Sequence, residues 1–159
     1  MNREQRQELV RRYREGPAVV EAALAGATQS ELDARPADGG WTARETVHHI
    51  ADSETTSAIR LRRLIAEDQP AIIGYDGDEF ARRLYYGSRP VESALAVITA
   101  ARTSTAEILD QLTEAEWART GTHNEHPSYG VSEWLEIYAA HCHEHAEQVA
   151  AALAEARRR

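Results

Sequence analysis

The chain has 159 residues, which suits one domain, and its 26 acidic and 18 basic residues give a net charge of −8. This balance argues against a nucleic-acid partner, because phosphate binding draws on Lys and Arg. The single cysteine, Cys142, excludes an intramolecular disulfide and a CxxC motif. No apolar run approaches the length of a membrane span, and the charged first residues lack the apolar stretch of a signal peptide. We therefore expect a single domain over residues 1–159, located in the cytoplasm and without a membrane partner.

All 18 basic residues are arginine, so a lysine Schiff base and a P-loop lysine are excluded. Ala, Leu, Glu and Arg dominate the composition, whereas aromatic residues make up only 6%. This composition favours helices.

The first predicted helix covers about residues 2–27, with Pro17 as a kink or break. Its apolar stripe consists of Leu9, Tyr13, Val20 and Leu24. The loop DARPADGGW follows, because its Pro and Gly residues end a helix. The second predicted helix begins at Thr42, where T-A-R-E forms a capping box, and runs to about Glu67. Its apolar face consists of Val47, Ile50, Ala51, Ala58, Leu61 and Ile65.

Residues 70–90 predict an irregular connection that contains one or two helical turns around residues 79–84. Pro90 suits the first turn of a third helix, which ends near residues 111–113 and is followed by a short turn at 114–117. The stretch RTGTHNEHPSYG predicts a loop. Ser132 is then expected to cap a fourth helix that reaches the terminal arginines. Four amphipathic helices predict an all-α four-helix bundle with long inter-helix loops.

The seven histidines are grouped rather than scattered. His141 and His145 are four residues apart in the fourth helix, so both side chains project from one face at a spacing that suits two ligands of one metal. His143 points away from them and is expected to be exposed. Catalytic zinc sites commonly use three protein ligands and an open position. The third ligand could be His48 or His49 on the second helix, and periodicity does not choose between them.

Four further side chains need an interpretation. Glu54 falls on the apolar stripe of the second helix, where a carboxylate must be paired, and a structural role is favoured over that of a general base. His126, before Pro127, is interpreted as a residue that orders its loop. Cys142 lies on an apolar stripe and is interpreted as a small core residue. The three tryptophans are expected to anchor helix ends: Trp41, Trp117 and Trp134.

Four motifs occur in order over about residues 20–155: GWTARETVHHIADSE, PAIIGYDGDEFARRL, HPSYG and YAAHCHEHAEQV. Together they resemble the DinB/YfiT-like superfamily, often described as metal-dependent hydrolases. The resemblance implies a four-helix bundle in which three histidines bind a divalent metal, one on the second helix and a pair on the fourth. By that pattern the ligands here are His49, His141 and His145.

The resemblance also implies an activity. Its characterised members include metal-dependent transferases and isomerases that use low-molecular-weight thiols such as bacillithiol. We therefore expect a thiol S-transferase or a hydrolase that acts on a small molecule, with zinc or nickel favoured over iron, manganese or copper. The sequence supplies no clear general base, and Glu54, Asp52 and His126 are candidates by position only. A homodimer is expected by analogy with the family.

Two other classes of function remain open. The chain could be a non-catalytic metal- or ligand-binding protein related to stress. It could also be a structural bundle in which the histidines fill polar positions of the core.

Overall fold

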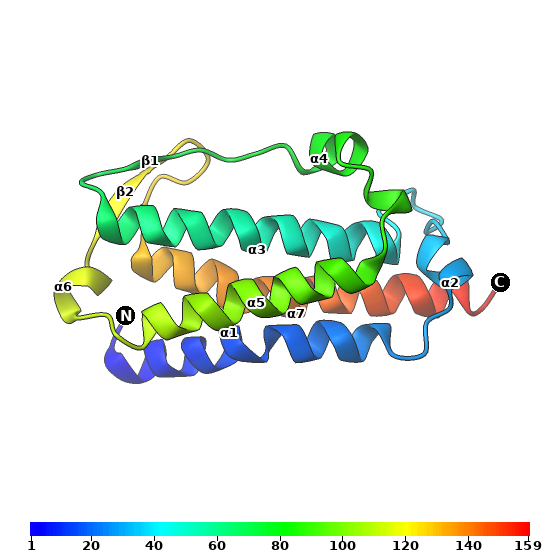
Figure 1. Ribbon diagram of the computed structural model, residues 1–159, viewed down its shortest axis with the longest axis horizontal. Coiled ribbons are helices and arrows are strands. Elements are labelled where there is room, and N and C mark those ends of the chain that lie inside the picture. The colour runs from blue at the N-terminus through cyan, green and yellow to red at the C-terminus, as the bar shows by residue number, and fades with distance from the viewer.

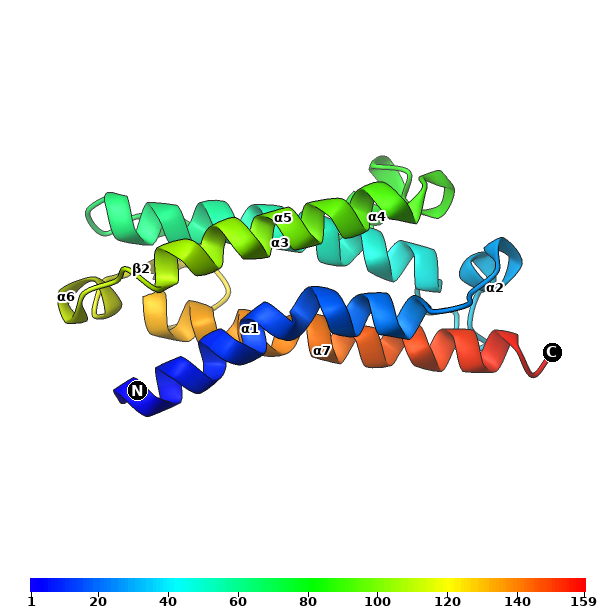
Figure 2. The same cartoon turned by 60° about the horizontal axis from the view of Figure 1, so that its bottom comes forward.

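The computed structural model describes residues 1–159 and contains four long helices: α1 (Arg3–Leu24), α3 (Ala43–Ala66), α5 (Val91–Leu109) and α7 (Val131–Ala156). Helix α1 packs against α7 and α5, and α3 packs against α5 and α7, so the four helices form a closed ring (Figure 2). The predicted all-α four-helix bundle is confirmed. Shorter elements lie between the long helices: α2 (Gln29–Asp33), β1 (Ala71–Ile72), α4 (Gly77–Arg83), η1 (Tyr86–Ser88), α6 (Glu114–Trp117), β2 (Thr120–His123) and β3 (Tyr129–Gly130).

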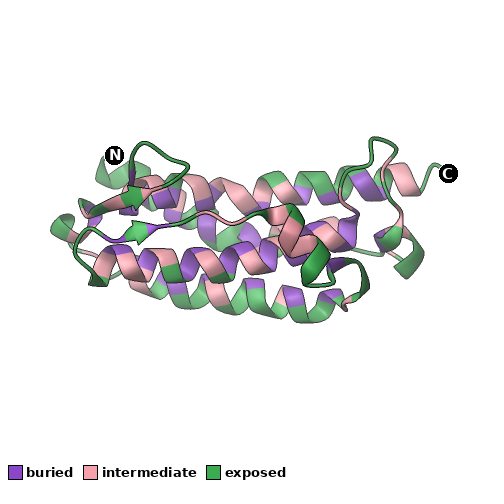
Figure 3. Cartoon of the chain, turned by 90° about the horizontal axis from the view of Figure 1, so that it is seen from above, coloured by how far each residue is buried: buried purple, intermediate pink, exposed green.

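The direction of the helices explains the long connections. Helices α1 and α7 run one way along the bundle, and α3 and α5 both run the other way (Figure 1). Because α3 and α5 are parallel neighbours, the chain must return along the whole length of α3 before α5 can begin. The return segment, which we call the strap, comprises residues 73–80 and leads from β1 into the first turn of α4. It runs above α3 in Figure 1 and, seen from above, over the line where α3 meets α7 (Figure 3).

The connections of α1 and of α7 contain structure that the sequence did not predict. Thr28 and Glu31 form a capping box, which starts α2 in the short stretch between the first predicted helix and the predicted loop. Strands β2 and β3 pair antiparallel within the stretch predicted as a loop, and β2 also pairs parallel with β1. This small sheet depends on pairing between segments about 50 residues apart, which local periodicity does not report.

The capping predictions are confirmed at α3 and wrong at α7. Thr42 accepts a hydrogen bond from the Glu45 amide, as the capping box requires. Helix α7 instead begins at Val131 with Gly130 as its N-cap, and the Ser132 hydroxyl donates to the Trp117 carbonyl. The Val131 amide is bonded to the carbonyl of Arg119, just before β2, and the helix starts two residues earlier than Ser132 as its N-cap would allow. Pro90 is likewise the N-cap of α5 rather than a residue of its first turn.

Pro17 lies inside α1 without breaking it. A proline has no N–H, so the carbonyl of Tyr13, four residues earlier, loses its helical partner. The Arg102 guanidinium of α5 donates to this carbonyl at 2.5 Å. Gly16 makes this approach possible, because a Cβ at that position would lie 2.3 Å from Arg102 Nη1. The lost helical bond is thus replaced by a tertiary one.

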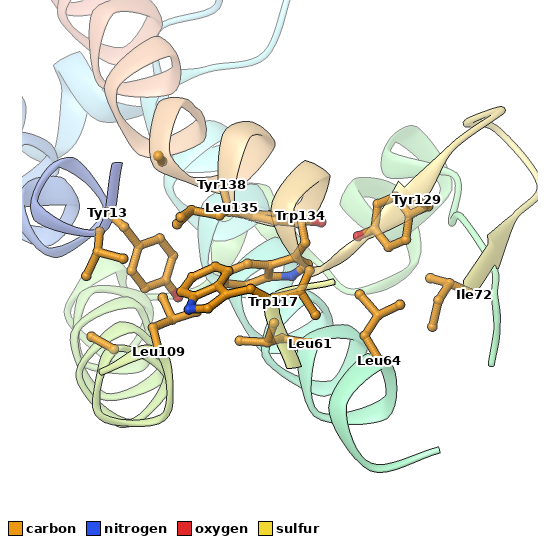
Figure 4. Packing of buried hydrophobic residues seen from close by; sticks show 14 residues of the cluster. Tyr13, Leu61, Leu64, Ile72, Leu109, Trp117, Tyr129, Trp134, Leu135 and Tyr138 are labelled. Carbon is orange, nitrogen blue, oxygen red and sulfur yellow. The ribbon is translucent and has the colours of Figure 1, made fainter. Parts of the chain in front are cut away.

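The core consists of two apolar clusters, and a buried polar layer lies between them. One cluster, at the end near the small sheet, includes Tyr13, Leu61, Trp134 and Tyr138 (Figure 4). The other includes Val47, Ile98, Cys142 and Val149. In the polar layer Arg102 Nη2 donates to Glu54 Oε1 at 2.8 Å, with both side chains buried. The expectations that Glu54 is a buried, paired group and that Cys142 is a core residue agree with this arrangement.

Candidate metal centre

Three histidines meet where α3 packs against α7. His49 comes from α3, and His141 and His145 come from successive turns of α7. Each offers one ligand atom, and these atoms lie within 4.8 Å of one another. The ring centroid of His49 is 5.5 Å from that of His141 and 4.7 Å from that of His145. These three residues, which we call the triad, are those indicated by the resemblance.

His48 points away from the triad. Its side chain is buried, and Nε2 lies 3.1 Å from the Arg89 carbonyl before α5. Burial lowers its pKa, which favours the neutral ring. His143 also lies outside the triad and contacts the Arg12 carbonyl of α1 at 3.1 Å; it is half-buried rather than exposed.

Neighbouring side chains orient the two rings on α7. Nδ1 of His141 lies 3.6 Å from Glu54 Oε1, while its Nε2 lies 3.3 Å from the Ser53 hydroxyl. Nδ1 of His145 lies 2.9 Å from Gln148 Oε1, one turn further along the helix. An amide oxygen only accepts, so this contact puts the proton of His145 on Nδ1 and leaves the lone pair on Nε2. Such outer partners fix the tautomer and orientation of metal-binding histidines.

The electrostatics of the triad favour neutral rings. Burial, and then the nearby rings of His145 and His141, lower the pKa of His49 to about 3. The pKa of His145 is lowered by burial and by His141. Burial opposes the charge of Glu54, but the Arg102 guanidinium and the contact with His141 outweigh it, and the pKa of Glu54 is lowered. A cation binds to neutral imidazoles, so these protonation states, beside an ionised buried carboxylate, are the ones that metal binding requires.

The donor set fits a divalent cation. Nδ1 of His49 is buried without a hydrogen-bond partner, and Nδ1 of His141 is likewise unsatisfied apart from its longer contact with Glu54. Such buried polar groups are rare unless they have a further partner. Three imidazole nitrogens are a ligand set that leaves coordination positions open, as catalytic sites do.

The triad lies under the strap and next to an open hollow. The ring of Trp41 packs at 4.7 Å from that of His49, and the Tyr75 ring of the strap lies at 6.5 Å. A Cβ on Gly77 would lie 3.8 Å from His49 Cε1 and 3.2 Å from the Trp41 ring, so the backbone of the strap passes close to both rings. A neighbouring hollow of about 710 Å³ is bordered by Trp41 and Gln148.

The candidate general bases lie elsewhere or have partners. Glu54 is held by Arg102, and Asp52 Oδ2 accepts from the Tyr86 hydroxyl at 2.6 Å. His126 is exposed on the β2–β3 loop, where it forms a second group of possible ligands with His123 and Glu125. The structure therefore does not bring His126 to the triad.

Sequence reasoning missed several neighbours of the triad. Tyr75 lies in a connection without periodicity, so no pattern indicated that it reaches His49. Ser53 and Gln148 had a usable signal, because they follow His49 by four residues and His145 by three, the spacings at which helical side chains meet. Trp41, expected only as an anchor, also covers His49 and donates to Asp78 at 3.0 Å.

Comparison with known proteins identifies the family. The family model described as the DinB superfamily matches residues 12–149. The chain belongs to the DinB superfamily. An Oceanobacillus iheyensis relative, named as an inferred metal-dependent hydrolase, is 33% identical to this DinB protein over 129 residues, or 81% of this chain and 74% of the relative. YfiT of Bacillus subtilis, named in the same way, is 30% identical over 146 residues, or 91% of this chain and 82% of YfiT.

A solved structure of YfiT resembles the DinB protein closely. The TM-score is 0.88 at 29% identity, and the match covers 99% of this chain and 89% of that one. YfiT is described there as a probable metal-dependent hydrolase with an unusual four-helix bundle topology. None of the helices of the DinB protein is both long and apolar enough to cross a membrane.

Proposed function

We propose that this DinB protein is a divalent-metal-dependent enzyme that hydrolyses a small molecule, with His49, His141 and His145 as the metal ligands. The observation that carries the proposal is the convergence of three ligand atoms within 4.8 Å, from two packed helices. The names of its relatives supply the reaction class.

The surrounding residues have separate roles in this proposal. A divalent cation held by three imidazoles lowers the pKa of a water or thiol that occupies an open position. Glu54 lies 3.6 Å from Nδ1 of His141, and Gln148 accepts from His145, so each helps to keep its ring turned toward the site. Trp41 and Tyr75 cover His49 and limit the access of bulk water. Imidazole ligands suit zinc or nickel, and also iron or copper, whereas manganese prefers oxygen ligands.

A second candidate is transfer of a low-molecular-weight thiol, of the bacillithiol kind, to an electrophilic small molecule. It is favoured by the engagement of Glu54 with Arg102 and of Asp52 with Tyr86, which leaves neither carboxylate free as a general base. A thiol has a pKa of about 8.5, far below that of water, and needs less help to ionise.

The assembly and location form part of the same proposal. We expect a homodimer with two-fold symmetry, by analogy with the family, in the cytoplasm. Light scattering on the purified, metal-loaded protein tests the dimer, which requires twice the mass of one chain. A mass of one chain at micromolar concentration would contradict it.

Elemental analysis of the untagged protein tests the function. The wild type should hold about one metal ion per chain, and His145→Ala should hold almost none. His143→Ala is the matched control, because it removes a histidine of α7 outside the triad, and it should keep the metal. A wild type that stays metal-free after incubation with zinc, nickel and manganese would overturn the proposal.

Activity assays then separate the candidates. Metal-loaded wild type, compared with His145→Ala, is tested on a panel of activated esters and amides, and on an electrophile with a low-molecular-weight thiol. A rate in the first assay supports the hydrolase, and a rate only in the second supports the transferase. Tight metal binding without a rate in either would indicate the non-catalytic class, a metal-binding protein.

A further inference from the structure

A second group of unsatisfied polar atoms lies under the strap, beyond the triad. Seven buried side-chain nitrogen or oxygen atoms have no hydrogen-bond partner, and three of them are Arg60 Nε, His123 Nε2 and the Tyr129 hydroxyl. They come from α3, β2 and β3. A buried donor without an acceptor costs free energy, so three such groups in one region need an explanation.

Arg60 has hydrogen bonds to neutral groups only. Its Nη1 donates to the Tyr138 hydroxyl at 3.1 Å, and its Nη2 donates to the Ile73 carbonyl of the strap at 2.8 Å. Twelve of the 18 arginines form ion pairs with carboxylates, and Arg60 does not. A half-buried guanidinium with an unpaired Nε–H therefore faces this region without a counter-charge.

His123 presents a donor to the same region. Its Nδ1 accepts from the Glu125 amide at 3.0 Å, which places the proton of the neutral ring on Nε2. Arg60 reaches the same part of the sheet, because the Ile73 carbonyl that accepts from it follows Ile72, which pairs with His123. Burial, and then the charge of Arg60, lower the pKa of His123. The side chain of Glu125, whose charge also acts on His123, is exposed and forms no hydrogen bond with any of the three donors.

Tyr129 completes the group. Its ring lies 4.6 Å from that of His123, and its hydroxyl end points from the small sheet toward the helices (Figure 4). Burial and Tyr138 raise the pKa of Tyr129, while the charge of Arg60, which donates to the Tyr138 hydroxyl, opposes them. The hydroxyl therefore stays protonated and can donate.

We propose that Arg60, His123 and Tyr129 bind a carboxylate group of the substrate. One positive charge and two neutral donors match a singly charged oxyanion, which accepts several hydrogen bonds, and charge-assisted bonds of this kind are the strong ones. The inference rests on the proposed function, because it names the class of substrate as a small organic acid. Its recognised carboxylate lies away from the reacting centre.

The placement relative to the triad suits one substrate that spans both sites. Arg60 follows His49 by eleven residues on the same face of α3, a rise of about 16 Å between Cα atoms. Tyr75 of the strap lies between them, 5.9 Å from the Arg60 guanidinium and 6.5 Å from the His49 ring. The strap therefore covers both sites.

The test uses nuclear magnetic resonance of the metal-free protein. The Arg60 Nε–H is buried and slow to exchange, and its signal is identified by its loss in Arg60→Gln. Titration with succinate at constant ionic strength should shift this signal saturably, and the same shift should occur in His145→Ala. Binding without the triad thus separates this inference from the proposed metal site. A linear shift that chloride reproduces would overturn the inference.

Variants define the donors. Affinity for succinate, followed through backbone amides near Tyr129, should fall at least about 10-fold in Arg60→Gln and several-fold in Tyr129→Phe, which removes only the hydroxyl. Arg62→Gln is the matched control, since Arg62 contacts Ser104 and Thr105 of α5 on another face of α3. Unchanged affinity in a folded Arg60→Gln or in Tyr129→Phe would overturn the inference. Tighter binding of inorganic phosphate than of succinate would overturn the choice of a carboxylate.

Discussion

The molecule has two histidine groups, each with three possible metal ligands, and their surroundings differ greatly. The triad stands on two packed helices, and its side chains are half-buried. The group of His123, Glu125 and His126 stands on a loop, and two of its three members are exposed. In the triad the outer nitrogens face Glu54 and Gln148, whereas in the loop a backbone amide takes Nδ1 of His123.

This difference shows that ligand count alone does not define a metal site. Ligands on helices are held in place before the ion arrives, so little ordering entropy is lost on binding. Ligands on a loop must be ordered first. In the loop group the Glu125 amide also donates to Nδ1 of His123, and this hydrogen bond occupies a lone pair that a metal would need.

Metal affinity should separate the two groups most strongly. We expect calorimetry with zinc to give about one tight site per chain, with any binding at the loop at least about 100-fold weaker. Two of the three loop ligands are exposed, and the Nδ1 lone pair of His123 is already taken. His126→Ala should leave the tight site unchanged. A stoichiometry near two, reduced to one by His126→Ala, would break the comparison.

Removal of a carboxylate should be costly beside the triad and harmless at the loop. Glu54→Gln leaves Arg102 buried without a counter-ion and should lower the free energy of unfolding by about 3 kcal/mol, measured with urea. Zinc affinity should also fall about 10-fold as His141 loses its partner. The same change at exposed Glu125 should alter neither quantity, and equal effects at the two positions would contradict the assigned roles.

The neutral, half-buried histidines of the triad should make stability depend on pH. The pKa of His49 is about 3 in the folded chain and that of His145 is also lowered, against about 6.5 when unfolded. The unfolded chain therefore takes up protons first as the pH falls. The metal-free protein should lose stability below pH 6.5, by at most about 1.4 kcal/mol per pH unit for each histidine. His49→Gln should reduce this slope in urea unfolding between pH 6.5 and 4.5, and a parallel profile would argue against a neutral, buried His49.

The smallest expected effect concerns Gln148, the exposed hydrogen-bond partner of His145. Gln148→Ala removes the acceptor of His145 Nδ1 and should weaken zinc binding by about 10-fold with little change in unfolding free energy. Glu147→Ala is the matched control on the neighbouring exposed position of α7. Identical zinc affinities in the two variants would mean that α7 alone orients the ring.

The sequence predicted the long helices well and their connections poorly. Apolar periodicity and the Thr42 capping box report interactions within one helix, and these placed α3 to within a residue. The small sheet and the start of α7 depend on contacts of Arg119 and Pro70 with distant backbone, and no local signal carries that information. Pro17 shows the same limit, because the partner that keeps α1 continuous, Arg102, is far away in sequence.

The candidate site was predictable to a similar degree. Spacing alone identified His141 and His145 as a pair but left His48 and His49 equivalent, since they flank the apolar stripe of α3 almost symmetrically. The family resemblance favoured His49, and the geometry groups His49 with the pair. Tyr75 and Arg60 belong to segments that meet only after folding, so their place near the triad required the three-dimensional structure.

The packing of α1 against α7 has a consequence for how the protein folds during its synthesis on the ribosome. The first and last helices are neighbours, and the middle of the chain contributes the other pair. A nascent chain can pair α3 with α5 early, and α1 can pack against α5, but the interface between α1 and α7 must wait until α7 has been synthesised. Such late, long-range closure leaves apolar surface open to chaperones. The triad also cannot form before then, because His141 and His145 are both on α7. The bundle and its metal centre should therefore be completed in one final step.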